Sequence, residues 1–354
     1  PYSFTRRGEP WFAWEWGSDV LLALVHRAAG LRGVVLLAGI LIAATSAVLF
    51  EFLLWQRVNL VVAVVASMMA ASASMVHWLA RPHLFTCLLF VVSLWLLEAD
   101  RRNPSRQVWA VVPLAALWAN LHCGFAVLLG TLGVYWLGEA ARTLRAGAPF
   151  DCRGVRRWGG LWAAAGAATL LNPYTWRLHW HIAGFLRSDF IRNQVEEFQS
   201  PRFRGESMGA FELLLIGGVV GIGWLWRQRD YATAMLVAGM AHAALGSVRH
   251  VPLYAAAATP VVARMASDAL QTLRGPWGMA LASLARDLAP SRERAVRFRL
   301  PLAALAAVAL AALLLDSGRA RWRVDFPAEK FPQAALGAAE EKLVGRRVLT
   351  SDQW

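Results

Sequence analysis

Polar and cationic side chains suited to binding an anion recur at alternate ends of the long apolar runs in this chain. Arginine holds phosphate through parallel N–H donors, and histidine can donate, accept or carry a proton near neutral pH. The residues concerned are His77, Arg81, His83, Asn120, His122, Asn172, Arg249 and His250. If the apolar runs fold back and forth, these residues come to one face. The spacing therefore predicts a site on that face for a negatively charged substrate.

Two short connections carry the same Arg-His combination. Arg81-Pro82-His83 joins one pair of apolar runs and Arg249-His250 joins another. We interpret both as binding a substrate phosphate; the alternative for each is a tight turn with a solvated arginine.

The asparagines are further substrate-binding candidates. Asn120 and His122 would orient a hydroxylated substrate, or instead cap the backbone of a polar turn. Asn172, which opens the longest loop, is a substrate-binding candidate as well.

Three carboxylates are candidates for general-base catalysis. Glu15 lies between Trp14 and Trp16, where loss of water would raise its pKa toward neutrality. Asp19 follows four residues later and is otherwise explained as a favourable charge at a helix start. Glu197 follows Glu196, and adjacent side chains do not face one point in regular structure, so a solvated face is the alternative for one of them.

Metal binding has weak support in the sequence. His179 and His181 are two residues apart, but spacing fixes no third ligand, and Trp180 between them favours an aromatic belt at a membrane boundary. We predict no metal ligands and no cofactor, with a divalent metal left open. The cysteines are too scattered for a disulfide framework: Cys87, Cys123 and Cys152.

The composition predicts a membrane protein. Of 354 residues, 57% are hydrophobic and 18 are tryptophan, and the mean hydropathy is +0.42. Soluble domains are about 45–50% apolar. The net charge of +13 would suit nucleic acid, but the apolar runs leave no continuous basic face, so we expect no nucleic-acid partner.

The elements that must position these residues are membrane-spanning helices. We predict an all-α polytopic membrane protein with about ten transmembrane helices. Residues 1–31 form an outer loop with a surface helix at 19–29, residues 32–315 form the transmembrane domain with a long outer loop at 172–209, and residues 316–354 begin an outer C-terminal region. The apolar runs are 32–54, 60–79, 84–99, 107–121, 124–141, 158–171, 210–226, 231–246, 251–266 and 299–315.

Arginine clusters predict the orientation. They lie in the connections 100–106, 142–157, 227–229 and 267–299, which fall on one side when the runs are counted. The excess of arginine in short cytoplasmic connections makes that side the inner one. Arg319, Arg321 and Arg323 in the outer tail run against this bias. We expect a multi-pass protein of the inner (plasma) membrane with its site on the extracytoplasmic side.

The sequence resembles the GT-C membrane glycosyltransferases, and most of all the bacterial relatives of the dolichyl-phosphate-mannose protein mannosyltransferases. The resemblance covers nearly the whole chain but rests on short motifs. These are Pro1-Tyr2-Ser3-Phe4-Thr5 with Gly8 and Pro10, Trp14-Glu15-Trp16 with Asp19, Arg81-Pro82-His83, Trp118 to His122 with Gly124, Asn172-Pro173-Tyr174, and Glu197 to Pro201.

The resemblance implies transfer of a sugar, with inversion, from a polyprenyl-phosphate donor to an acceptor hydroxyl. The partners would be the lipid-linked donor, membrane lipids, and an acceptor glycan, lipid or protein. In the family an acidic residue of the first outer loop is the base. Because the chain starts at Pro1 and ends as a polar region opens, we expect it to be cut at both ends, and the family's acid to lie at Glu15 or before Pro1.

Two other function classes remain as alternatives. An O-antigen polymerase or ligase also pairs many spans with a long outer loop rich in arginine and histidine, but would use a pyrophosphate-linked oligosaccharide. A transporter is less favoured, because no inverted repeat or charged midplane helix is visible in the sequence.

Overall fold

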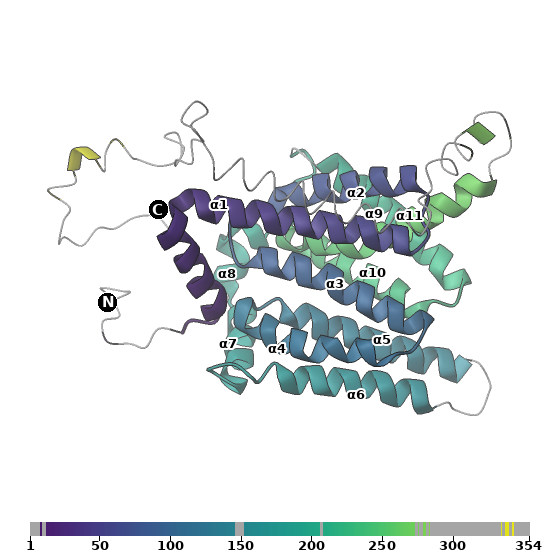
Figure 1. Ribbon diagram of the computed structural model, residues 1–354, viewed down its shortest axis with the longest axis horizontal. Coiled ribbons are helices and arrows are strands. Elements are labelled where there is room, and N and C mark those ends of the chain that lie inside the picture. Colours follow the sequence, from purple (N-terminus) through teal and green to yellow (C-terminus); the bar gives the residue numbers. More distant parts are fainter. Residues whose placement is uncertain are drawn as a thin grey trace.

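The computed structural model describes residues 12–145, 152–205 and 208–272, together with a few isolated positions, and in these ranges every regular element is a helix (Figure 1). The elements are α1 (Trp16–Trp55), α2 (Leu60–Ser74), η1 (Met75–His77), α3 (His83–Arg102), η2 (Arg106–Ala110), α4 (Val111–Leu121), α5 (Phe125–Arg145), α6 (Cys152–Ala168), α7 (Trp176–Arg187), α8 (Asp189–Gln194), η3 (Glu196–Phe198), α9 (Met208–Arg227), α10 (Tyr231–Gly246), η4 (Val248–His250) and α11 (Val251–Thr272).

Four of the described helices are long and apolar enough to cross a membrane: α1, α2 with η1, α3 and α9. α10 is apolar but shorter. The predicted apolar runs from 32–54 to 251–266 each overlap a helix, and the helices continue through Pro113 of α4 and Pro260 of α11. The run 299–315, the tail 316–354 and most of residues 1–11 fall outside the described residues.

α1 is two helical segments joined at Gly30. Gly30 has φ 61° and ψ −160°, a backbone conformation that costs glycine little and other residues much. The predicted boundary between a helix at 19–29 and a run from residue 32 therefore falls at a real break. Figure 1 shows the first segment, in dark purple, running across the end of the bundle before the second segment joins it.

α11 occupies the centre of the bundle, packed against α2, α9, α10 and α3. Its residues 255–258 are four consecutive buried alanines. Small side chains let neighbouring helices approach closely, which is how helices without a hydrophobic driving force pack in lipid. A compact centre of this kind fixes the ends of the surrounding helices relative to each other.

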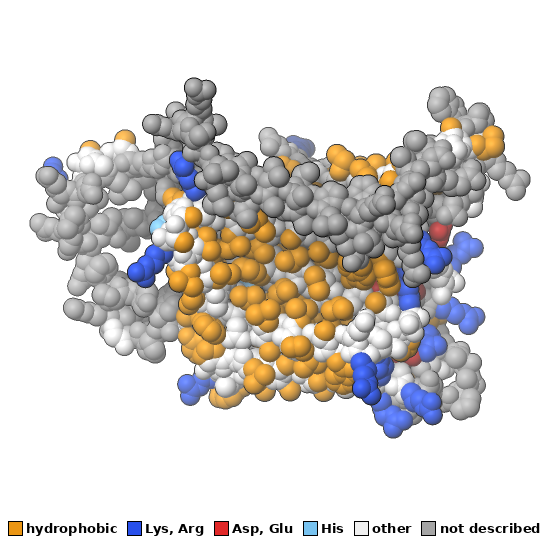
Figure 2. Space-filling view, viewed as in Figure 1, with side chains coloured by type: hydrophobic (Ala, Val, Ile, Leu, Met, Phe, Trp, Pro, Cys, Tyr) orange, Lys and Arg blue, Asp and Glu red, His pale blue; other side chains and the backbone are white. Residues whose placement is uncertain are grey.

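Ion pairs join the connections at one end of the bundle. Arg101 at the end of α3 contacts Asp230 in the turn between α9 and α10, at 2.5 Å between Nη2 and Oδ1. Arg157 of α6 contacts Asp100 of α3, also at 2.5 Å. Figure 2 shows basic side chains, here arginines, clustered at this end, beside an apolar surface across the middle of the visible face. The opposite end carries α7 and α8.

Candidate functional site

A cavity with both cationic and anionic walls lies at the end of the bundle that carries α7 and α8. It holds about 470 Å³ of empty space. Its walls come from five separate connections in the chain. They are formed by Trp14, Glu15, His77, Arg81, Pro82, His83, His122, Cys123, Phe185, Glu197 and Arg249.

A second cavity of about 720 Å³ adjoins the first and is mainly apolar. The two share Trp14, His77, His83, His122, Cys123, Phe185 and Arg249. The second then continues along Ala126, Val127, Ile182, Leu186 and Leu253. The combined space is amphipathic, polar at the mouth and apolar toward the helices.

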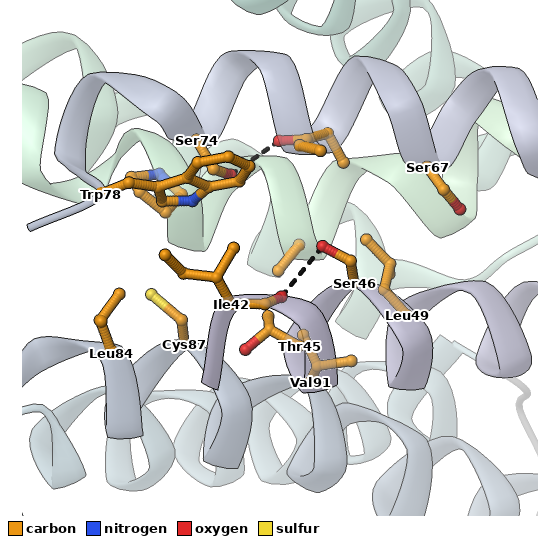
Figure 3. A pocket seen from close by; sticks show the side chains of 14 residues that line it. Ile42, Thr45, Ser46, Leu49, Ser67, Ser74, Trp78, Leu84, Cys87 and Val91 are labelled. Carbon is orange, nitrogen blue, oxygen red and sulfur yellow. Dashed lines mark hydrogen bonds between the residues drawn. The ribbon is translucent and has the colours of Figure 1, made fainter. Parts of the chain in front are cut away.

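A third pocket lies between α1, α2, α3 and α11, and Cys87 lines both it and the second cavity. Figure 3 shows Ser46 of α1 and Ser74 of α2 facing this pocket, with Cys87 of α3 beside them. The Ser46 hydroxyl donates to the Ile42 carbonyl and the Ser74 hydroxyl to the Ala70 carbonyl. These two hydroxyls are therefore bonded to their own helices, whereas the buried Ser67 hydroxyl of the same wall has no hydrogen-bond partner among the described residues.

Glu15 is held where the first helix docks on the α4–α5 connection. Trp16 Nε1 donates to Asn120 Oδ1 at 2.8 Å, and the Ser18 hydroxyl donates to the Leu121 carbonyl. One Glu15 oxygen lies 3.3 Å from Nε2 of His122. Burial, followed by the negative charge of Asp19, raises the pKa of Glu15 to about 7. A carboxylate with this pKa is suited to accept a proton near neutral pH.

Arg81 and Glu197 face each other across the mouth of the cavity. Arg81 Nη1 lies 3.3 Å from Glu197 Oε2, and His77 Nε2 lies 3.9 Å from the same oxygen. The Glu197 backbone is fixed by the next connection, because the Ser247 hydroxyl donates to its carbonyl at 2.8 Å. Arg81 is 58% exposed, so its guanidinium can exchange this partner for an incoming anion.

Arg249 supplies a second cation to the same space. Its guanidinium lies over the Phe198 ring, 4.4 Å from the centroid, which orients it without neutralising its charge. The neighbouring His250 points Nδ1 at the Ala243 carbonyl, 3.3 Å away. Burial and then the charge of Arg249 lower the pKa of His250. The Arg-His connection therefore presents one charged and one neutral side chain.

A chain of aromatic rings connects the N-terminal segment to the cavity. Phe12 stacks on both Tyr174 and His181, at 4.0 and 4.3 Å between centroids. Trp14 then packs edge-on against His181 and Phe185. This packing places Trp14, and with it Glu15, against α7.

Glu15, His122 and Cys123 bring three potential metal-ligand atoms within 4.8 Å of one another. The hydrogen bonds of His122 do not fit a metal there. The Gly124 backbone N–H can only donate, and it points at Nδ1 of His122 at 2.9 Å. Nδ1 is therefore the acceptor, and the ring proton of neutral His122 lies on Nε2, the nitrogen that faces Glu15. A protonated nitrogen has no lone pair for a metal.

The structure brings together eight of the predicted site residues. Those that line the two cavities are Glu15, His77, Arg81, His83, His122, Glu197, Arg249 and His250.

Three predicted site residues lie elsewhere. Asp19 is exposed one turn beyond Glu15 and does not line the cavities. The Asn120 amide donates to the Ala116 and Leu171 carbonyls, and the Asn172 amide donates to the Thr169 and Thr175 carbonyls. Both amide nitrogens are therefore occupied by backbone carbonyls, and the Asn120 oxygen accepts from the Trp16 indole.

The two histidines of α7 lie in different environments. His179 Nε2 donates to the Thr169 hydroxyl at 2.8 Å, whereas His181 stacks on Phe12. Side chains two apart on a helix point to different faces, so this spacing cannot make a joint site.

The sequence did not indicate Trp14, Thr86 or Cys123 as site residues. Thr86 lies one helical turn after His83, where a single threonine in an apolar run does not indicate a site.

Comparison of the chain with protein-family models, with curated proteins and with solved structures gave no match.

Proposed function

We propose that this protein is a polytopic membrane glycosyltransferase of the GT-C type. It would transfer a sugar from a polyprenyl-phosphate donor to an acceptor hydroxyl. The observation that carries the proposal is one cavity in which a carboxylate with a pKa of about 7 and two arginines lie together, continuous with an apolar cavity. A base, an anion site and a lipid-compatible wall are the features that this reaction requires.

In the proposed reaction, Glu15 accepts the proton of the acceptor hydroxyl. The acceptor oxygen forms a bond to the anomeric carbon while the bond from that carbon to the phosphate oxygen breaks. The electron pair leaves with the polyprenyl phosphate, and the sugar configuration inverts. Arg81 and Arg249 stabilise the charge that grows on the departing phosphate, a contribution of electrostatic type.

The charges around the cavity support these roles. Glu197 already pairs with Arg81, so an entering phosphate would take its place beside that guanidinium. Arg249 lines both the polar and the apolar cavity and so stands at their junction. A lipid phosphate placed there would have its charge between the arginines and its chain along the Ile182 and Leu186 side.

The membrane arrangement is part of the proposal. We propose about ten spans, with the first segment of α1 lying along the outer surface of the inner membrane and the cavity on the extracytoplasmic side. The ion pairs of Arg101 and Arg157 support this orientation, because they unite arginine-rich connections at the end opposite the cavity.

The test uses the purified chain in liposomes with labelled donors. We expect transfer from a polyprenyl-monophosphate sugar, and a loss of at least about 100-fold in Glu15→Gln, the range expected when a general base is removed. Activity should rise as pH increases through about 7, because the base acts only when deprotonated.

Asp189→Asn is the matched control, since Asp189 is 81% exposed on α8 and lies outside the cavity. Full activity in Glu15→Gln would overturn the assignment of the base. Transfer only from pyrophosphate-linked oligosaccharides would replace the proposal with a polymerase or ligase.

A further inference from the structure

We infer that His122 is a positioning residue for Glu15, locked as a hydrogen-bond donor by Trp118, Thr86 and Gly124. The catalytic role of His122 rests on the proposed function, whereas its hydrogen-bond arrangement does not. It replaces the sequence-based interpretation of His122 as a substrate-binding side chain.

The direction of each hydrogen bond follows from the groups involved. Trp118 Nε1 can only donate, and it donates to the Thr86 hydroxyl oxygen at 2.8 Å. The Thr86 hydroxyl lies 2.7 Å from Nδ1 of His122. Because the Gly124 N–H points at Nδ1, that nitrogen carries no proton, and the Thr86 hydroxyl hydrogen shares its single lone pair with the Gly124 N–H.

The other ring nitrogen of His122, Nε2, is therefore fixed as a donor. With Nδ1 occupied as an acceptor, the neutral imidazole carries its proton on Nε2, which lies 3.3 Å from a Glu15 oxygen and 3.8 Å from the Cys123 sulfur. The ring cannot flip without leaving the Gly124 and Thr86 donors unpaired in a buried place. His122 is 7% exposed, so water cannot replace those bonds.

Other charges around His122 keep it neutral. Burial, and after it the charge of Arg249 and the neighbouring His83 and His77, lower the pKa of His122 well below its ordinary value. A neutral N–H donor stabilises the ionised form of Glu15 without binding the proton that Glu15 must take up.

The N–H thus opposes the groups that raise the pKa of Glu15. The charged and titratable groups that act on Glu15 are Asp19 on α1, Glu197 on η3, Arg249 on η4, and Cys123 through its backbone on the α4–α5 connection. Of these, Asp19 and Glu197 raise the pKa, as burial does, whereas Arg249 and the Cys123 backbone lower it.

Nitrogen NMR of histidine-labelled full-length protein in lipid nanodiscs tests the inference without substrate. The His122 signal, identified by its loss in His122→Gln, should show a neutral ring with the proton on Nε2 from pH 8 down to pH 6. Thr86→Val should change that signal, and Thr86→Ser, which keeps the hydroxyl, should not. A proton on Nδ1, a charged ring at pH 7, or an unchanged Thr86→Val spectrum overturns it.

The activity of the same variants separates this inference from the proposed function. We expect Thr86→Val to lower kcat roughly 10- to 100-fold with little change in KM, as loss of orientation does. The pH at which activity rises should move upward by about one unit, because a donor to the carboxylate is weakened. An unmoved pH profile overturns the positioning role. If the wild type transfers no sugar, the proposed function fails while the NMR result still decides the state of His122.

Discussion

Glu15 is a half-buried carboxylate near a second carboxylate, Asp19, and its pKa of about 7 compares with 4.5 for the free side chain. The folded protein therefore binds a proton that the unfolded chain has released between these pH values. Below about 4.5 both states are protonated and the side chain is neutral in both. As pH rises from about 4.5 to about 7, the unfolded chain ionises before the folded one, so this residue increasingly destabilises the folded state; above about 7 the destabilisation stays constant.

This linkage predicts a pH-dependent stabilisation by Glu15→Gln. The variant should unfold about 2–4 °C above the wild type at pH 8, and by much less at pH 5, in thermal scans of detergent-solubilised protein. Glu196→Gln is the control, because Glu196 is exposed and does not line the cavity with Glu15. An equal shift at both pH values would contradict the linkage.

Among single residues, the sequence predicted as site residues those whose side-chain chemistry and position in the chain are both unusual. Glu15 between tryptophans and the two Arg-His connections are of this kind. For Asn120 and Asn172 the sequence could not choose between substrate and backbone, because an amide at a helix end serves equally for either; in the fold both amides donate to backbone carbonyls. Thr86 could not be found, since its role depends on contacts with α4 and the residues after it.

At the scale of elements, the docking of α1 on the end of α4 sets the position of Glu15. Gly17 lies at the closest approach: a Cβ there would come within 2.6 Å of the Asn120 carbonyl oxygen. The Asn120 backbone cannot move aside as a flexible side chain can, so the first segment of α1 would have to shift. The glycine is therefore a requirement of the helix contact.

Gly17→Ala is accordingly expected to lower transfer activity by at least about tenfold, because displacement of a catalytic group by about 1 Å is costly. Gly39→Ala is a control on the same helix, since a Cβ at Gly39 meets nothing within 4 Å. Transfer assays and thermal scans of both variants provide the measurement. Equal activity in the two would show that this contact does not position Glu15.

The elements themselves were well predicted because apolar runs bounded by polar connections leave little freedom in placing helices. The break in α1 was marked by Gly30. Residues 172–209, predicted as a long outer loop, contain α7, α8 and η3. Their helices are short and amphipathic, and the aromatic contacts of Trp14 and Phe185 that order α7 join segments far apart in sequence.

At the scale of the whole molecule, the proposed orientation puts α8 outside and the α9–α10 turn inside. Asn193 and Gln228 are exposed at these two places. In a Cys152→Ser background, Asn193→Cys in intact cells should react with a membrane-impermeant thiol reagent, and Gln228→Cys only after permeabilisation. The parent Cys152→Ser protein sets the background labelling. The reverse pattern would invert the topology and move the cavity to the cytoplasmic side.

Each wall of the cavity is supplied by a different connection: Glu15 before α1, Arg81 before α3, His122 after α4, Glu197 in η3 and Arg249 in η4. The two contacting pairs, Glu15 with His122 and Arg81 with Glu197, each join connections far apart in the sequence. During synthesis the anion site therefore does not exist until the last of these helices, α11, has entered the bundle. A ligand could bind in this cavity only after the whole chain has assembled, so misassembled protein would bind no ligand there.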